Sequence, residues 1–291
     1  MKALVLFSLV IGSPPKLDAL VAAANKKDPV ELDRVARRLG AGRLLHGLSD
    51  ASPEVRRAAL EGAPRVDDCW TLLIPAARLI SNRDDQVAQA AARAARRISA
   101  QLISGHDDLA ELPRDVPREA VRVLVQIARS PDVMAARRAD ALGVLAVLAP
   151  IAAPPRNDLL PLLDDPAAEV RRSAVDLLAA DKGAIDALAR VIERDAQSQV
   201  AGGAAAAVCN RLPRTAAGAW TRLRALALDA KLDPADAVDL LACLAAGGAD
   251  DRAVVSQAAK AHPAALVRAA ALDLAKSPGP APILRPASAP R

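Results

Sequence analysis

The residue types that most often carry chemistry are scarce in this chain and lie far apart. There are three histidines and three cysteines among 291 residues. No histidine is adjacent to a glutamate or to another histidine, and no two cysteines form a C-x-x-C pair, so neither type has the spacing of a metal site. These residues are His46, His106, His262, Cys69, Cys209 and Cys243. The sequence therefore predicts no metal site.

Paired acidic residues and glycine-containing stretches do not form a catalytic arrangement either. Asp67-Asp68, Asp84-Asp85 and Asp164-Asp165 stand where helices are expected to begin, and carboxylates there accept hydrogen bonds from free backbone N–H groups. The stretch AGGAAAA at 201–207 follows no strand pattern, which favours close contact between helices over a phosphate-binding loop. The chain contains no G-x-x-x-x-G-K-[ST] loop and no G-x-S-x-G elbow. We therefore expect no catalytic residues, no cofactor and no enzymatic activity.

The composition indicates an all-α protein. Alanine makes up about a quarter of the chain, whereas aromatic residues make up only 1%. Alanine is the strongest intrinsic helix former, and the aromatic residues that favour strands are nearly absent. No segment shows sustained alternation of apolar and polar residues, so no strand is predicted.

One segment recurs along the chain. SPEVRRAAL at 52–60 and PAAEVRRSAV at 166–175 share a helix-start proline, a valine and two arginines. Further copies place an equivalent valine at 87, 200 and 267, with weaker copies at 134–145 and 233–244, which gives a unit of about 30–34 residues. Ser52-Pro53 and Asp165-Pro166 are expected to cap these helices, and a shorter apolar helix precedes each of them. Such a helix pair cannot bury its own apolar faces, so successive pairs must stack.

The pattern L-x-D-x-x-x-x-V-R-x-A-A after a leucine-rich helix resembles HEAT repeats, particularly the short bacterial kind. The resemblance covers most of residues 17–276 and implies a right-handed α-solenoid of about seven to eight antiparallel helix pairs. It also implies that the turn aspartates and the arginines after the valine tie neighbouring repeats together. These residues are Asp50, Asp165, Asp195, Arg56, Arg171 and Arg268. Asn82 and His262 replace the aspartate in two repeats, where the continuity of this ladder is open.

The chain divides by composition into five segments. We expect a signal peptide at 1–13, repeats at 14–148 and 159–276, a proline-rich break at 149–158 and a disordered proline-rich tail at 277–291. The signal peptide would make the protein periplasmic or secreted; the alternative is a terminal helix packed on the first repeat of a cytoplasmic protein. Its apolar stretch is too short to span a bilayer.

Two cysteines are separated by about one repeat length. Cys209 and Cys243 are therefore expected on neighbouring helices. A disulfide is possible if the protein is exported, and separate buried thiols that behave as small hydrophobic side chains are the favoured alternative.

The polar face of the second helices is the predicted interaction surface. The stripe two residues past each valine, together with the residues one turn further, is expected on the inner, concave face. The predicted partner-binding residues are Arg57, Gln89, Arg93, Arg138 and Arg172, with Glu61 and Asp176 beside them. A solvated face with local ion pairs is the alternative.

The predicted function is a non-enzymatic scaffold that binds another protein, which is unidentified. The net charge of +5 raises nucleic acid as a partner, but acidic residues are interleaved throughout, so nucleic acid is not favoured. The alternatives are a nucleic-acid-binding module, a DNA glycosylase-type module on a HEAT-like solenoid, an accessory subunit of a modifying enzyme, and a purely structural repeat protein.

Overall fold

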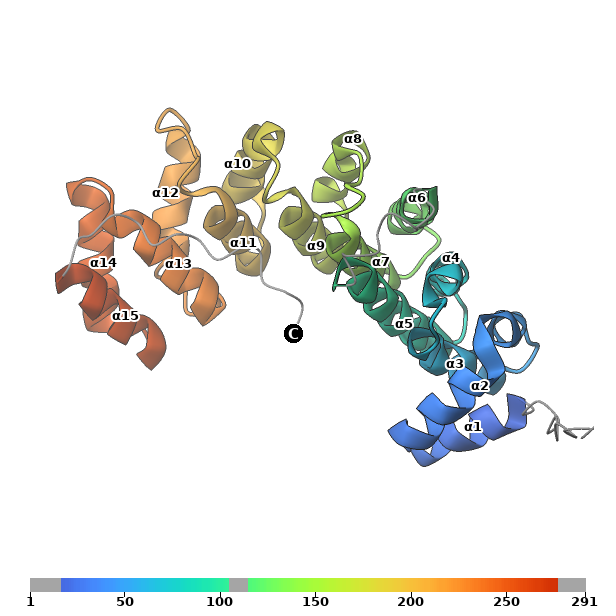
Figure 1. The fold of residues 1–291 in the computed structure, drawn as a ribbon. Helices are drawn as coiled ribbons and strands as arrows, with labels where there is room; N and C mark the ends of the chain where they lie inside the picture. Colours follow the sequence, from blue (N-terminus) through green and yellow to red (C-terminus); the bar gives the residue numbers. More distant parts are fainter. Residues whose placement is uncertain (1–16, 105–114, 277–291) are drawn as a thin grey trace, which may run out of the picture. The chain divides into compact units, whose positions relative to one another are not determined.

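Every element that the structure describes is a helix. The computed structural model describes residues 17–104 and 115–276, and Figure 1 shows the helices in chain order. The prediction of an all-α fold built from stacked helix pairs is confirmed. The expected signal peptide at 1–13, His106 and the expected tail at 277–291 lie outside the described residues.

The chain forms two compact units that divide between Val116 and Pro117. The first unit contains α1 (Leu17–Lys26), α2 (Pro29–Leu48), α3 (Pro53–Gly62), α4 (Leu73–Leu79) and α5 (Asp85–Ser104). The second contains nearly all of α6 (Asp115–Arg129), followed by α7 (Ala135–Leu148), α8 (Arg156–Leu159), α9 (Ala168–Leu178), α10 (Ile185–Arg194), α11 (Ser198–Val208), α12 (Ala217–Leu226), α13 (Pro234–Ala245), α14 (Ala249–Ala261) and α15 (Ala265–Lys276). Residues 149–158, where a break was predicted, lie inside the second unit, and α7 and α9 on either side of them pack together.

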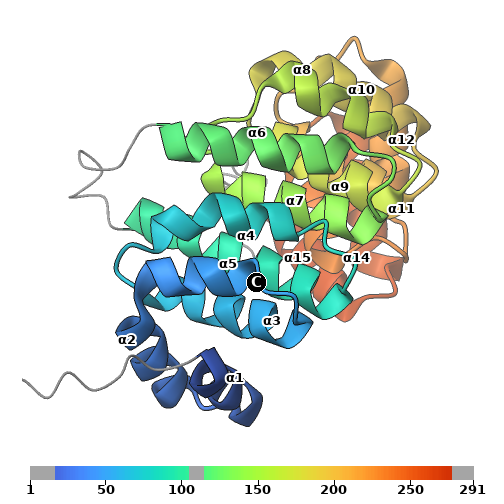
Figure 2. The same ribbon diagram turned by 90° about the vertical axis from the view of Figure 1, so that its right-hand side faces the viewer.

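Within each unit the second helix of one pair packs on the second helix of the next. In the first unit α3 contacts both α1 and α5, and in the second unit α7, α9, α11, α13 and α15 form a continuous row. The first helices pack on their own partners, as α4 does on α5 and α10 does on α11 (Figure 2). This arrangement buries the apolar stripes that a single helix pair leaves exposed.

Short polar residues and prolines set the helix starts. The Asp28 carboxylate accepts hydrogen bonds from the backbone N–H groups of Val30 and Glu31, both at 3.0 Å, and Pro29 opens α2. Ser52 caps α3 as predicted. The prediction that Asp165 is the N-cap of the later copy was wrong, because α9 begins at Ala168 and Asp165 forms a turn before it.

Glycine 40 divides α2 into two helical segments. Its φ of +72° is in the left-handed region, which glycine adopts without a steric penalty. The helix as a whole packs against both α1 and α3.

The core contains most of the valines that define the repeat, together with alanine-rich helix faces, whereas Val55 is half-buried. Val87, Val170, Val200 and Val267 are all buried, which confirms their predicted packing role. Many of the residues around them are alanines, whose small side chains let helix backbones approach closely. No helix among residues 17–104 and 115–276 combines the length and the apolar character needed to cross a membrane.

Candidate functional site

A common turn precedes the second helices. In it a side-chain acceptor takes the backbone N–H of the residue two positions later. The distances are 2.8 Å at Asp50, 3.0 Å at Asn82, 2.9 Å at Asp165, 2.8 Å at Asp195, 2.9 Å at Asp229 and 3.2 Å at His262. Asn82 and His262 make the same bond as the aspartates, so these turns are structural despite the substitutions.

The arginine after the valine closes this turn. Arg56 Nη1 donates to the carbonyl oxygens of Asp50 and Ala51 at 2.7 and 2.8 Å, and Arg171 and Arg268 repeat the pattern. Arg171 also donates to both carboxylate oxygens of Asp195 in the next repeat, at 2.6 and 3.0 Å. The hydrogen bond to the carboxylate raises the pKa of Arg171 above its usual value. The structural role implied for Arg171 is confirmed.

Arg138 belongs to this ladder, which corrects its predicted place on the partner surface. It is 7% exposed, donates to the Val133 carbonyl oxygen at 3.0 Å and forms an ion pair with Asp165 of the next repeat. Its position after the turn matches that of Arg171, because the repeat in this degenerate copy starts one residue later than predicted. Arg137, itself largely buried, stands in the place of the valine.

Arg172 was predicted to lie on the partner surface, but its side chain is bound by other residues of the same chain. Its Nη1 lies 2.7 Å from Asp236 Oδ2 on α13 and 2.6 Å from the carbonyl oxygen of Gln199. Its Nε also lies 3.2 Å from Asp176 Oδ1. The side chain crosses α11 at Gly203, where a Cβ would overlap the guanidinium. The adjacent Gly202 closely contacts Leu232, so AGGAAAA at 201–207 serves close packing, as predicted.

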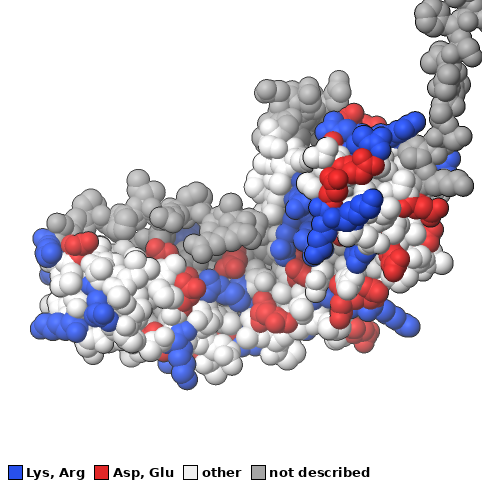
Figure 3. Space-filling view, turned by 90° about the horizontal axis from the view of Figure 1, so that it is seen from below, with Lys and Arg blue, Asp and Glu red and all other residues white. Residues whose placement is uncertain are grey.

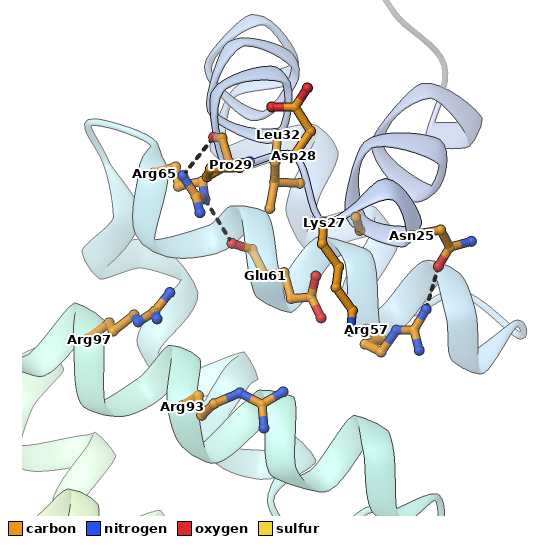
Figure 4. A pocket seen from close by; sticks show the side chains of 11 residues that line it. Asn25, Lys27, Asp28, Pro29, Leu32, Arg57, Glu61, Arg65, Arg93 and Arg97 are labelled. Carbon is orange, nitrogen blue, oxygen red and sulfur yellow. Dashed lines mark hydrogen bonds between the residues drawn. The ribbon is translucent and has the colours of Figure 1, made fainter. Parts of the chain in front are cut away.

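The predicted residues of the first unit remain at the surface and two of them line one pocket. Arg57 on α3 and Arg93 on α5 border a pocket of about 390 Å³, whereas Gln89 is exposed on α5 outside it. Figure 4 shows Lys27, Arg57 and the Glu61 carboxylate on one side and Arg93 and Arg97 on α5 facing them. The full lining is Ala24, Asn25, Lys27, Asp28, Pro29, Leu32, Arg57, Glu61, Arg65, Arg93 and Arg97.

The pocket carries an excess of positive charge. Five of its lining side chains are cationic and two, Asp28 and Glu61, are carboxylates. Seen from below, Lys and Arg side chains gather on the part of the surface that the first unit occupies, with acidic side chains beside them (Figure 3, right).

Some of these cations are fixed by the protein and others are not. Arg57 donates to Gln86 Oε1 at 2.8 Å and to Asn25 Oδ1 at 2.6 Å, and Arg65 donates to the Pro29 carbonyl oxygen at 3.1 Å. Arg93 and Arg97, one turn apart on α5, are exposed and make no hydrogen bond or ion pair with any other described residue. These two arginines are therefore available to an external anion.

Sequence reasoning missed three cations of this pocket: Lys27, Arg65 and Arg97. Arg97 follows Arg93 by one helical turn, a spacing that could have found it. Lys27 lies in a turn and Arg65 ends a short 3-10 helix, Ala63–Arg65, so the periodicity of the repeat helices gives no orientation for either. Their convergence with α5 depends on how the first three repeats stack.

The comparisons with known proteins agree with this architecture. A family described as "HEAT repeat associated with sister chromatid cohesion" matches residues 44–61, which span the end of α2 and most of α3. Importin beta is structurally similar over 89% of this chain, with a TM-score of 0.59 and 15% identity. This chain has the fold of stacked HEAT-like repeats.

Two further findings define the extent of the similarity. The chain spans only 40% of the importin beta chain. It also resembles the Escherichia coli protein YibA, with a TM-score of 0.56 and 14% identity, over 90% of this chain and 93% of that one. No curated protein matches the sequence.

A second pocket, in the second unit, is built around a neutralised carboxylate. Asp251, buried at the start of α14, accepts hydrogen bonds from Arg224 at 2.7 Å and Arg214 at 3.0 Å. Burial opposes its ionisation, but these hydrogen bonds hold the pKa of Asp251 below its usual value. Arg214 also lies 3.9 Å over the ring of Trp220, which is buried and offers no surface for base stacking.

The three cysteines are buried free thiols. Cys209 and Cys243 lie against each other on neighbouring helices, where their mutual hydrogen bond and burial raise the pKa of Cys209. Burial likewise raises the pKa of Cys69. Thiols with raised pKa values are poor nucleophiles at neutral pH.

Proposed function

We propose that this HEAT-repeat protein is a non-enzymatic scaffold that binds another protein through the second-helix face of its N-terminal unit. The partner-binding residues of this proposal are Arg57, Gln89 and Arg93. The observation that carries this proposal is that Arg93 and Arg97 are exposed and pair with no carboxylate of residues 17–104 and 115–276, whereas Arg138 and Arg172 of the second unit are held by Asp165 and Asp236.

The partner that fits this face is an extended acidic segment of a protein. Charge complementarity accelerates association and selects against basic partners. The fold supports this proposal, because stacked helix pairs present a long surface to an extended chain. Two features argue against nucleic acid: carboxylates stand among the cations of the pocket, and Trp220 is buried.

The test is partner capture with charge-reversal variants of the full chain. Arg57→Glu combined with Arg93→Glu should abolish recovery of the partner from extracts of the native host. Arg78→Glu, at an exposed position on the first-helix side of the same unit, is the matched control and should leave recovery unchanged. Equal recovery with both variants would exclude this face.

The proposal extends to export of the protein, as residues 1–13 suggest. The measurement is the intact mass of the protein made in its own host. Loss of about 13 residues at the N-terminus supports export. An unprocessed chain would remove the periplasmic or secreted assignment and leave the cytoplasmic one.

A further inference from the structure

The pocket of the N-terminal unit contains a lysine held in a backbone conformation that lysine rarely adopts. Lys27 has a φ of +53° and is the sole non-glycine residue with positive φ among the described residues. It ends α1, where the N–H of Lys27 donates to the Ala24 carbonyl oxygen at 3.1 Å and that of Asp28 donates to the Ala23 carbonyl oxygen at 3.4 Å. Glycine is the usual residue at this position of such a helix end.

Lysine at this position is therefore not explained by stability. A side chain in the left-handed region is sterically disfavoured relative to glycine. The Lys27 side chain lines the pocket beside Arg57, across from Arg93 and Arg97 of α5 (Figure 4). The Lys27 side chain makes no hydrogen bond or ion pair with another described residue. Strained residues of this kind cluster at binding sites.

The arginines of the pocket are arranged to receive an anion with several oxygens. Arg57 is oriented by Gln86 and Asn25, and its buried Nε has no hydrogen-bond partner in the described part of the chain. Arg93 and Arg97 contribute two more guanidinium groups from α5. Guanidinium groups bind phosphate and carboxylate oxygens through paired, charge-assisted hydrogen bonds.

We infer that this pocket binds a phosphate monoester carried by a phosphorylated side chain of the acidic partner segment. Five lining cations face two lining carboxylates, and Arg65 also lies 3.9 Å from the Asp33 carboxylate, which leaves an excess of about two positive charges. One carboxylate of a partner does not neutralise this excess, whereas a phosphate monoester carries nearly two negative charges at neutral pH. A volume of about 390 Å³ is at the small end of the range of ligand pockets and suits one side chain. This inference rests on the proposed function for the identity of the carrier.

Glu61 allows a test in which the affinity should change in the opposite direction. Its carboxylate faces the pocket and makes no ion pair with another described residue. It therefore repels a bound phosphate, and Glu61→Gln should strengthen binding where each cation-removing variant weakens it.

The experiment measures the binding of three fluorescent acidic dodecapeptides that differ only in a central phosphoserine, serine or glutamate. The full chain is compared with Lys27→Gly, with Arg93→Gln plus Arg97→Gln, with Glu61→Gln and with Arg78→Gln as the control. We expect the phosphoserine peptide to bind about tenfold more tightly than the other two, and Lys27→Gly to remove most of that difference. Lys27→Gly should also raise the melting temperature, so lost binding cannot be attributed to unfolding.

The outcomes separate this inference from the proposed function. Equal affinity for all three peptides, reduced by Arg93→Gln plus Arg97→Gln, would overturn the phosphate inference and leave the acidic-segment proposal standing. A second outcome is that the chain prefers the phosphoserine peptide while the variant Arg57→Glu plus Arg93→Glu still captures the partner. This outcome would support the phosphate site and reject the proposed function. Absence of binding by any peptide at millimolar concentration, or preference for a 20-base-pair DNA duplex over the phosphoserine peptide, would overturn the inference.

Discussion

Arg172 and Asp236 form an ion pair, with 2.7 Å between Nη1 and Oδ2, although they are 64 positions apart in the sequence. Arg172 is on α9 and Asp236 is on α13, and α11 lies between these two helices. The pair spans α11 because Gly203 has no side chain. It links α9, α11 and α13 along the second-helix face, and it explains why a glycine is present inside α11.

The first prediction is that the effect of Gly203→Ala depends on Arg172. Alanine in a helix interior normally gains up to about 1 kcal/mol over glycine. In the Arg172→Ala background we expect this gain in the free energy of unfolding, measured by urea denaturation. In the wild-type background the new methyl group displaces the guanidinium from Asp236, so the gain should vanish or become a loss.

The neighbouring glycine provides the control for this cycle. A Cβ at Gly202 would overlap Leu232 and does not approach Arg172. Gly202→Ala should destabilise both backgrounds by the same amount. An identical gain from Gly203→Ala in both backgrounds would show that Arg172 does not cross α11.

The second prediction separates stability from binding at Arg138. Arg138 and Asp165 form a buried pair, so Arg138→Ala leaves an uncompensated carboxylate and should lower the free energy of unfolding by about 3–5 kcal/mol. Arg57→Ala, at a half-buried residue that forms no ion pair with any described residue, should lower it by about 1 kcal/mol or less. Thermal and urea unfolding of the two variants measure the difference, and similar values would contradict the ladder role of Arg138.

The third prediction concerns acid. The folded-state pKa of Asp251 is below its unfolded value of about 4, so its stabilising contribution is complete above that value and is lost as the pH falls through the folded pKa. Asp251→Asn should lower the free energy of unfolding by about 1–3 kcal/mol at pH 7, since both arginines are partly exposed to solvent. The deficit should shrink as the pH falls below about 4; a deficit that stays constant from pH 7 down to the lowest pH at which the protein is folded would refute the assignment.

The fourth prediction is that the thiols react only after unfolding. Cys69, Cys209 and Cys243 are buried, and their environments disfavour the nucleophilic thiolate in Cys69 and Cys209. A neutral-pH maleimide reagent should label none of them in the native protein and all three in denaturant, as counted by intact mass. Rapid labelling of the native protein would contradict the burial of these thiols. A mass lower by about two daltons, as a disulfide between Cys209 and Cys243 would give, would contradict the free thiols of this pair.

Local sequence predicted the repeat because every helix pair needs a buried apolar stripe, a capped helix start and a turn, wherever it occurs in the chain. The buried valines, the caps at Ser52 and Pro53 and the turn at Asp50 depend on neighbours within a few residues. The register of residues 134–145 was wrong because a mostly buried arginine, Arg137, stands where the pattern has valine. Hydrophobic periodicity cannot identify such a position.

The candidate surface was predicted in part, for a related reason. Arg57 and Arg93 follow from helical spacing, since a residue's face on its own helix is set by local geometry. Whether such an arginine is free depends on residues elsewhere: Arg172 is held by Asp236, and Arg138 by Asp165. No spacing rule connects these residues.

The sequence by itself determined that this chain is a stack of helical pairs, because apolar period, caps and turn residues act over a few residues. The tertiary structure alone decided which cations are neutralised and which converge, because ion pairing depends on distances between repeats. Lys27 shows the difference most clearly. In the sequence it is one charge in a turn, and in the folded unit it lies opposite two arginines of α5.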